Sequence, residues 1–230
     1  MKGAKRSVFM TGFALEAMAF LSLIVLLPPG MAAQKEEPRS GGELVFAVGE
    51  PPPSFDGHRE TTFALIHPVA PHYSTLLRFD PRNYPKIVGD AAERWTVSKD
   101  GLTYAIKLRK GIRFHDGSPL LAKDVKATYD KIIFPPEGVA SARKASYSVV
   151  EKVEAPDDLT VVFHLKYPSA SFLANLASPW NFIYSAEKLK QDPRWYEKNV
   201  MGSGPFVFAE YVPGSHSKSG YWTNRPTSFT

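Results

Sequence analysis

The sequence predicts a mixed α/β fold, of the α+β kind, in a globular chain. Two segments alternate apolar and polar residues on either side of a turn, as β-hairpins do, and a segment with the apolar spacing of an amphipathic helix separates them. No internal repeat or heptad pattern competes with this mixture. The composition agrees, because 43% hydrophobic and 13% aromatic residues are enough to form a buried core.

The composition also excludes several classes of function. The 230 residues include 28 Lys and Arg against 23 Asp and Glu, which gives a formal net charge of +5. Acidic and basic residues are interspersed rather than clustered, so we expect no nucleic-acid partner. Because the chain has no cysteine, it has no disulfide, no thiolate metal site, no cysteine nucleophile and no lipidated cysteine.

Residues 1–33 have the layout of a signal peptide. Basic residues precede an apolar run over 8–27, and small residues follow at 31–33. Glu16 inside the run and the prolines after it favour export over an uncleaved membrane anchor, which is the alternative. We therefore expect a periplasmic or extracytoplasmic protein whose polar residues 34–42 form a mobile lead-in.

Short strands are expected on both sides of a helix-like segment at the start of the exported part. Residues 43–49 are β-branched and apolar, and the prolines at 51–53 then end strand pairing. Thr61 and Thr62 precede an apolar spacing typical of a helix, which Pro68 interrupts. A second strand is expected over 75–79.

The clearest local signal is a hairpin over 95–108 with its turn at 98–101. Tyr104, Ile106 and Leu108 alternate with more polar neighbours, so one face of this strand is expected to be buried. Arg113 and Phe114 are expected to continue the sheet.

An amphipathic helix is expected over 122–133, because its apolar residues recur at helical spacing. A second hairpin over 149–165 is expected to pair with the first. The remaining expected elements are short helices at 169–177 and 185–191 and strands at 182–184 and 206–212.

No motif for catalysis is present. The sequence lacks a nucleophile elbow, a zinc-binding helix and a phosphate-binding loop, so we expect no enzyme and no cofactor. His67 and His72 have a spacing that does not impose convergence on a metal, so we expect no metal site. Gly202 and Gly204 are interpreted as a tight crossing of the chain rather than an anion site, because Pro205 removes a backbone donor.

Several motifs along the chain occur in a particular order and spacing. They are Ala92-Glu93-Arg94-Trp95, Ser98-Lys99-Asp100-Gly101-Leu102-Thr103-Tyr104, Lys107-Leu108-Arg109-Lys110-Gly111, Phe114-His115-Asp116-Gly117, Ala122-Lys123-Asp124-Val125 and Gly202-Ser203-Gly204-Pro205-Phe206. Together they resemble the family 5 extracellular solute-binding proteins, which are the peptide and nickel binders of ABC importers. The resemblance runs from about residue 41 to about residue 213.

The resemblance implies a periplasmic-binding-protein-like class II fold, with part of a main lobe and a complete accessory domain. By this analogy, residues 43–80 and 201–214 belong to the main lobe and residues 81–200 form the accessory domain, followed by an unmatched tail over 215–230. The implied function is the binding of a peptide or similar small solute between two lobes, and its delivery to ABC permease subunits in the membrane. We expect the protein to act as a monomer.

The resemblance also implies where ligand contacts lie. They are expected in the loop after the first strand and near the return to the main lobe, at Glu60, Thr61, Thr62, Phe63, Trp180 and Asn181. For any one of them, a helix cap or a buried aromatic is an equally good interpretation.

The sequence departs from the family after Gly214. Family members are typically about twice this length, and here a Ser-rich stretch over 215–220 replaces the expected alternation. We therefore expect a reading frame that is truncated or shifted near Gly214, termini that are partly disordered, and no measurable peptide affinity in calorimetry, because one wall of a cleft buries too little ligand. The alternative from another class is an exported or membrane-anchored interaction protein that keeps the accessory domain without transport.

Overall fold

The computed structural model describes residues 43–222, of which residues 47–222 lie in one compact unit. Residues 43–46 belong to a separate N-terminal unit. The predicted signal peptide and lead-in, and the residues after 222, lie outside the described residues. No helix among the residues described is long and apolar enough to cross a bilayer.

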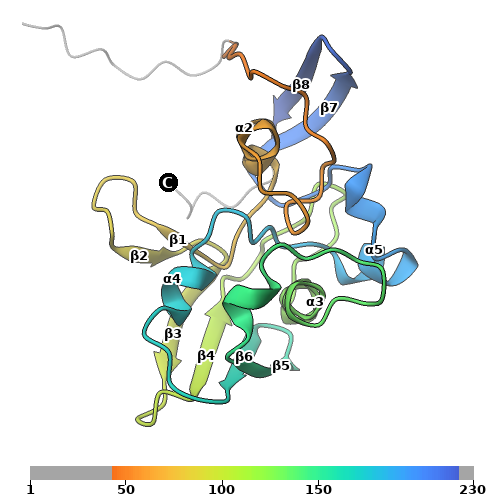
Figure 1. Ribbon diagram of the computed structural model, residues 1–230. Helices are drawn as coiled ribbons and strands as arrows, with labels where there is room; N and C mark the ends of the chain where they lie inside the picture. Colours follow the sequence, from red (N-terminus) through yellow and green to blue (C-terminus); the bar gives the residue numbers. More distant parts are fainter. Residues whose placement is uncertain (1–42, 223–230) are drawn as a thin grey trace, which may run out of the picture. The chain divides into compact units, whose positions relative to one another are not determined.

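A four-stranded antiparallel sheet in the order β3-β4-β6-β5 organises the compact unit (Figure 1). Its strands are β3 (Ala92–Val97), β4 (Thr103–Leu108), β5 (Val150–Asp157) and β6 (Thr160–Leu165). The β3–β4 turn places Gly101 at φ +71°, a conformation that glycine adopts without strain. Both predicted hairpins are therefore confirmed, and β4 pairs with β6 as expected.

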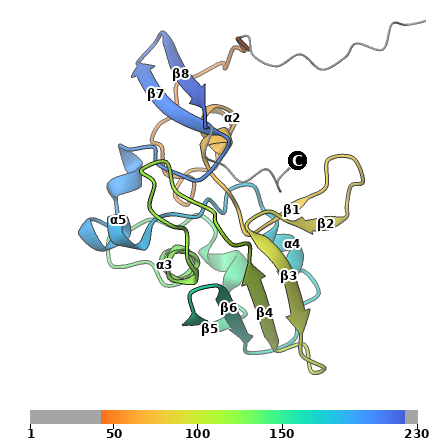
Figure 2. The ribbon, with the colours of Figure 1, turned by 180° about the vertical axis from the view of Figure 1, so that it is seen from behind.

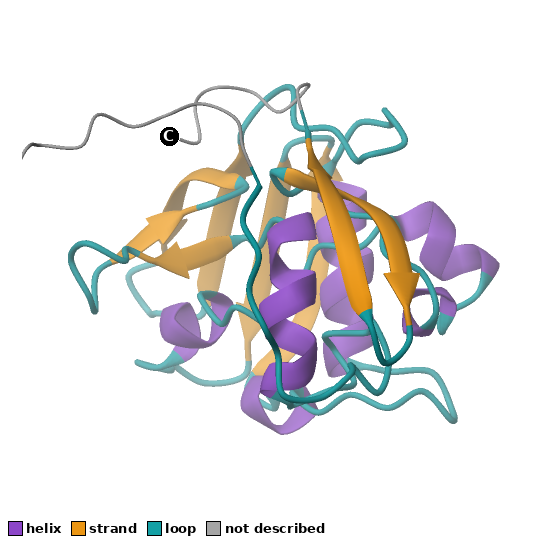
Figure 3. Cartoon of the chain, turned by 90° about the horizontal axis from the view of Figure 1, so that it is seen from above, coloured by secondary structure: helices purple, strands orange, loops and turns teal. Residues whose placement is uncertain are grey.

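Helix α3 (Ala122–Ile133) packs against one face of this sheet (Figure 3). Its buried Val125, Tyr129 and Ile132 lie in one hydrophobic core with Ile106 and Phe163 of the sheet. The sequence predicted this helix with the same bounds. Its first turn is held by Asp124, whose carboxylate accepts a hydrogen bond from the Leu121 amide at 2.8 Å.

Shorter elements complete this part of the unit. They are β1 (Leu77–Phe79), β2 (Ile87–Gly89), η2 (Lys144–Tyr147), α4 (Phe172–Leu176), α5 (Ala186–Gln191) and η3 (Trp195–Glu197). β1 is the predicted strand over 75–79 in a shorter form, and α4 and α5 are the two predicted short helices.

Helix α2 (Phe63–Val69) and the 3-10 turn η1 (Ala70–His72) follow the expected apolar spacing, with Pro68 inside the helix. Thr62 is the N-cap residue, although its side chain makes no capping hydrogen bond. Leu65, Ile66 and Val69 of this helix pack in a second cluster with four aromatic residues, which are Tyr73, Phe182, Tyr184 and Tyr196.

A two-stranded hairpin of β7 (Phe206–Val212) and β8 (His216–Tyr221) lies beside α2 in both views of Figures 1 and 2. Strand β7 was predicted and is confirmed. Strand β8 was not predicted, because its sequence His-Ser-Lys-Ser-Gly-Tyr lacks apolar alternation, and all six of its residues are exposed. The expected loss of apolar alternation after Gly214 thus does not prevent a strand from forming there.

Three predicted strands are wrong, and in each case the backbone finds other partners or none. Residues 43–49 form no strand. Arg113 makes a single bridge to Pro119 rather than a strand. Residues 182–184 are buried but bond mainly to side chains: the Tyr184 amide donates to the Thr128 hydroxyl at 2.8 Å, and the Phe182 carbonyl accepts from the His58 ring at 2.9 Å.

Candidate functional site

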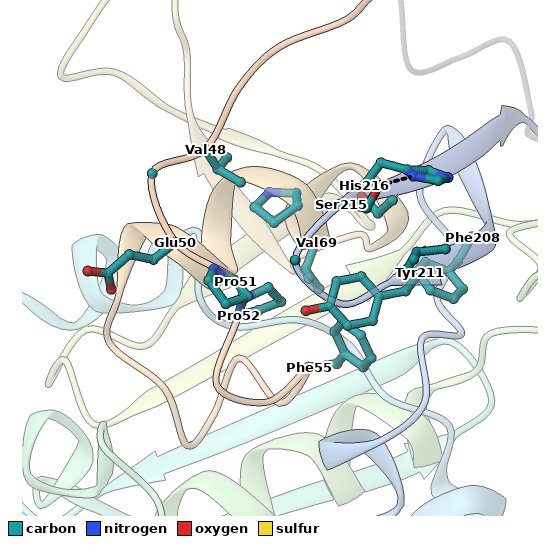
Figure 4. Close-up of a pocket in the computed structure, with 15 residues that line it drawn as sticks. Val48, Glu50, Pro51, Pro52, Phe55, Val69, Phe208, Tyr211, Ser215 and His216 are labelled. Carbon is teal, nitrogen blue, oxygen red and sulfur yellow. Dashed lines mark hydrogen bonds between the residues drawn. The ribbon is translucent and has the colours of Figure 1, made fainter.

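A cavity of about 220 Å³ lies between the loop over 48–55, helix α2 and the β7–β8 hairpin (Figure 4). Apolar side chains dominate its lining, which includes Val48, Pro51, Pro52, Phe55, Pro68, Val69, Phe208 and Tyr211. Glu50 lies at one end of the cavity, and Ser215 and His216 lie at the other. The cavity therefore offers an apolar surface with polar groups at its ends.

The ring of Phe55 joins the loop to the hairpin. It meets the ring of Tyr211 edge-on at 5.3 Å between centroids, and the ring of Phe208 at 5.7 Å. Such tilted contacts are favourable for aromatic pairs. The Phe55 amide also donates to the carbonyl of Glu197 at 3.1 Å. This residue is therefore fixed both by its backbone and by its ring.

The hydroxyl of Tyr211 points toward Pro52 in the cavity and makes no hydrogen bond within the part of the chain that the structure describes (Figure 4). His216, in contrast, is engaged with its neighbours, because its ring nitrogens lie 2.9 Å from the Ser215 hydroxyl and 2.9 Å from the Glu210 carboxylate. Tyr211 thus offers a hydroxyl to a molecule in the cavity.

A buried polar network holds the loop just beyond Phe55. The Asp56 carboxylate lies 2.6 Å from the Lys131 ammonium of α3 and accepts a hydrogen bond from the Tyr184 hydroxyl at 3.0 Å. Burial alone would raise the pKa of Asp56, but His58 and Lys131 outweigh it through charge and hydrogen bonds, and the pKa lies below its ordinary value. Burial, helped by the charge of Lys131, lowers the pKa of His58 to about 3, so its ring is neutral at pH 7.

None of the six residues predicted as ligand contacts lines this cavity. Glu60 is turned inward, since its carboxylate accepts a hydrogen bond from the Ser54 hydroxyl at 2.8 Å. Thr61, Thr62 and Phe63 lie exposed at the start of α2, where Phe63 stacks on His67.

Arg143 brings Glu60 and Trp180 together. Its guanidinium donates to the carbonyl of Glu60 at 2.6 Å and lies over the Trp180 ring at 4.4 Å from the centroid. Asn181 is fully buried and donates to the Tyr147 hydroxyl and to the Asn175 carbonyl, both at 2.8 Å. Asn181 and Arg143 also line a second cavity, of about 250 Å³.

The sequence interpretation missed the residues that do line the first cavity. In the sequence, the proline run at 51–53 indicates only the end of a strand, whereas Pro51 and Pro52 form an apolar wall beside Phe55. Phe208 and Tyr211 belong to a predicted strand, but their side chains become part of the cavity only because Phe55 packs on both.

Within residues 43–222 no group of three or more His, Cys, Asp or Glu side chains is arranged to hold a metal ion. The Gly202 and Gly204 segment packs against the chain at His72, with the Gly204 amide donating to the His72 carbonyl at 2.9 Å. The predicted tight crossing is confirmed.

Comparison with known proteins agrees with this fold. Residues 86–226 match the family model of the bacterial extracellular solute-binding proteins, family 5 Middle. The match extends past Gly214, where the sequence pattern was expected to end.

The relatives that the chain matches are named as binding proteins for glutathione or for peptides. The chain is 34% identical over 185 residues to the glutathione-binding protein GsiB of Pectobacterium atrosepticum, a match that covers 78% of this chain and 35% of the relative. It is 31% identical over 233 residues to di/tripeptide-binding protein 2 of Pseudomonas aeruginosa, covering 89% of this chain and 42% of the relative. The chain thus spans less than half the length of these relatives.

Solved structures show the same fold. The oligopeptide-binding protein AppA of Bacillus subtilis, in complex with a nonapeptide, superposes with a TM-score of 0.69 at 28% identity, covering 76% of this chain and 35% of that chain. The dipeptide-binding protein of a Pseudoalteromonas species, in complex with Met-Leu, gives a TM-score of 0.68 at 25% identity, covering 76% of this chain and 39% of that chain. By its family match, its relatives and its fold, the chain belongs to the family 5 bacterial extracellular solute-binding proteins.

Proposed function

We propose that this chain belongs to the periplasmic substrate-binding component of an ABC importer, which binds peptides or a similar small solute and delivers it to membrane permease subunits without catalysis. The names of the relatives, which include di/tripeptide-binding and glutathione-binding proteins, support a peptide-like solute. The signal-peptide pattern of residues 1–33 supports export.

We also propose the division into lobes that the resemblance implies. Residues 43–80 and 201–214 would belong to the main lobe and residues 81–200 to the accessory domain. The lining of the cavity supports this division, because it comes from main-lobe residues in 48–69 and 208–214 with Ser215–Ser217 of the tail, and includes no residue of 81–200. The cavity would then be one wall of the cleft in which the family holds its ligands.

The observation that carries the proposal is the chemistry of this cavity. It combines an apolar floor at Phe55, Val69 and Phe208 with the free hydroxyl of Tyr211. Binding sites for small molecules are largely apolar with a few placed polar groups, and they usually measure ~300–1,000 Å³. A cavity of about 220 Å³ therefore accommodates one or two side chains of a peptide rather than a whole ligand.

The six residues expected as ligand contacts remain proposals. Thr61, Thr62 and Phe63 are exposed and free to meet a ligand, and Trp180 is half-buried under Arg143. Glu60 and Asn181 are less available, because their side chains already bond within the chain. We propose that the exposed members contribute to the rim of the cleft.

The test is protein-observed NMR of this chain with the dipeptide Met-Leu, an apolar probe small enough for the cavity. We expect saturable shifts at millimolar peptide in Phe55, Val69 and Tyr211, and no heat signal in calorimetry, since one wall gives weak binding. Tyr211→Phe should weaken the interaction because it removes the free hydroxyl. The matched control is Tyr221→Phe, whose exposed ring lies on β8 outside the cavity.

Absence of any shift at these residues would contradict peptide binding at this cavity. In that case the other function, an exported or membrane-anchored interaction protein, gains support if a protein partner binds without peptide. A ligand that binds only the folded state would instead raise the melting temperature of the chain, which favours transport.

A further inference from the structure

We propose that the buried pair of Asp56 and Lys131, with the Tyr184 hydroxyl, is the positioning device for Phe55 and so couples helix α3 to the shape of the cavity. The proposal concerns the placement of Phe55 and stands on contacts in the chain. Its consequence for peptide affinity rests on the proposed function.

The ion pair is short and almost inaccessible. The Lys131 ammonium lies 2.6 Å from the Asp56 carboxylate, and the two side chains are 4% and 2% exposed. The other ion pairs of the described residues have at least one partner more than a fifth exposed. Lys131 is thus a lysine that α3 directs inward, toward the loop that carries Phe55.

Tyr184 fixes the same loop from a second side. Its hydroxyl donates to Asp56 at 3.0 Å and accepts from the Gly57 amide at 2.9 Å. Its ring stacks on Tyr196 at 3.7 Å between centroids, so the hydroxyl is held in place by packing. The three residues that follow Phe55 therefore each have an anchored group. These are the Asp56 carboxylate, the Gly57 amide and the His58 amide, which donates to the Asp56 carboxylate at 2.9 Å.

The anchored backbone sets the direction of the Phe55 side chain. Phe55 precedes Asp56 directly, and its ring lies in the cavity against Tyr211 and Phe208. Phe55 is only partly buried, and the two rings that it contacts both belong to the β7–β8 hairpin. The polar anchor constrains the backbone next to Phe55, and the ring contacts then hold its side chain against the hairpin.

Burying the charged Asp56–Lys131 pair costs desolvation free energy, which an apolar pair in the same place would not. Removing an ammonium and a carboxylate from water is unfavourable, and well-packed apolar residues in their place are often equally stable. A buried ion pair at this position is better explained by the geometry that it imposes than by the stability that it adds. The loop holds one orientation because the partners of Asp56 lie on two separate segments, α3 and residue 184.

The test places a fluorinated phenylalanine at Phe55, and separately at Phe114 in the other core, and compares their fluorine NMR signals. The variants are Lys131→Met, which removes the ammonium, and Tyr184→Phe, which removes only the hydroxyl and keeps the stacked ring. The control is Lys126→Met on the same helix, whose partner Asp130 is half-exposed. Unfolding by urea verifies that each variant is folded.

We expect the Phe55 signal to shift or broaden in Lys131→Met and in Tyr184→Phe, with the Phe114 signal unchanged and the control like the wild type. A Phe55 signal that stays unchanged in either folded variant, or one that changes together with Phe114, overturns the proposal. If Lys131→Met does not fold, Tyr184→Phe decides.

A titration with Met-Leu separates this inference from the proposed function. Displacement of Phe55 should weaken the binding of Met-Leu, with a dissociation constant about tenfold higher, which corresponds to ~1.4 kcal/mol. If the wild type does not bind Met-Leu, peptide binding fails while the fluorine signals still decide the positioning role. If Met-Leu binds the wild type and both variants equally, with Phe55 displaced, the coupling to the cavity is refuted.

Discussion

Two buried histidines make the stability of the fold depend on pH. Burial lowers the pKa of His58 to about 3 and the pKa of His72 to about 4, against an ordinary value of 6.5. Below about pH 6.5 the two histidines bind protons in the unfolded chain but stay neutral in the folded chain. Stability is fully present above that pH and is lost as the pH falls toward the folded values.

We expect the free energy of unfolding to fall by about 2 kcal/mol for each of these histidines between pH 7 and pH 5. Urea unfolding at a series of pH values measures the loss. NMR of the ring protons assigns it, because His58 and His72 should show no titration across roughly pH 5 to 8. A midpoint inside that range for either ring would contradict its buried, neutral state.

Gly204 is a position where the chain leaves no room for a side chain. A Cβ there would lie 2.4 Å from the His72 carbonyl carbon and 2.4 Å from the Pro71 carbonyl oxygen, which are both backbone atoms and cannot move aside easily. We expect Gly204→Ala to lower the free energy of unfolding by about 1–3 kcal/mol, as overpacking does. The control is Gly220→Ala, because a Cβ there meets nothing within 4 Å. Equal stability of the two variants would contradict the tight crossing.

At the scale of elements, Asp124 joins the starts of two helices. Its carboxylate accepts hydrogen bonds from the Leu121 amide before α3 and from the Ala186 amide at the first residue of α5, both at 2.8 Å. Asp124→Ala leaves both amides without this partner, so we expect a loss of about 2 kcal/mol in the free energy of unfolding. Asp130→Ala on the same helix should cost less than about 0.5 kcal/mol, because it breaks only an exposed pair with Lys126. Similar losses in both variants would show that Asp124 does not connect the helices.

The elements that the sequence predicted well are those whose burial pattern is local. Tyr104, Ile106 and Leu108 alternate along β4, and Val125, Tyr129 and Ile132 recur at helical spacing, so a window of a few residues contains the whole signal. The strand expected over 182–184 has the same apolar character. Its backbone instead bonds to Thr128 and His58, which are far away in the sequence, so no local window distinguishes it from a strand.

The candidate site was harder to predict than the fold for the same reason. The cavity depends on Phe55 meeting Phe208 and Tyr211, which lie more than a hundred residues later in the chain. The buried network around Asp56 and Lys131 is likewise non-local. The family resemblance pointed to Glu60–Phe63, and none of these residues lines the cavity. Exposure and side-chain direction, which a sequence motif does not encode, decide which residues of a loop can face a ligand.

At the scale of the whole chain, the strands of the described residues differ strongly in how many partner strands they have and in how deeply they are buried. Strand β4 has a partner on each side and three buried residues, whereas β8 is exposed along its full length and pairs only with β7. A two-stranded hairpin is marginally stable by itself. The β7–β8 hairpin is held mainly by Phe55 against Phe208 and Tyr211, and by the His72 ring accepting from the Ser219 hydroxyl at 2.7 Å.

This difference predicts local opening of the cavity wall. In native-state hydrogen exchange we expect the paired amides of β7 and β8 to exchange at least about a hundredfold faster than those of β4 and β6, a gap of ~2.7 kcal/mol in opening free energy. Because the hairpin forms one wall of the cavity, saturating Met-Leu should slow exchange in β7 and β8 while leaving β4 unchanged, since a ligand stabilises only the states that bind it. Equal protection of both sheets without peptide would mean that the hairpin folds as one unit with the central sheet. If peptide slowed exchange in all strands alike, Met-Leu would be raising the free energy of global unfolding rather than that of local opening. The hairpin would then open only together with the core.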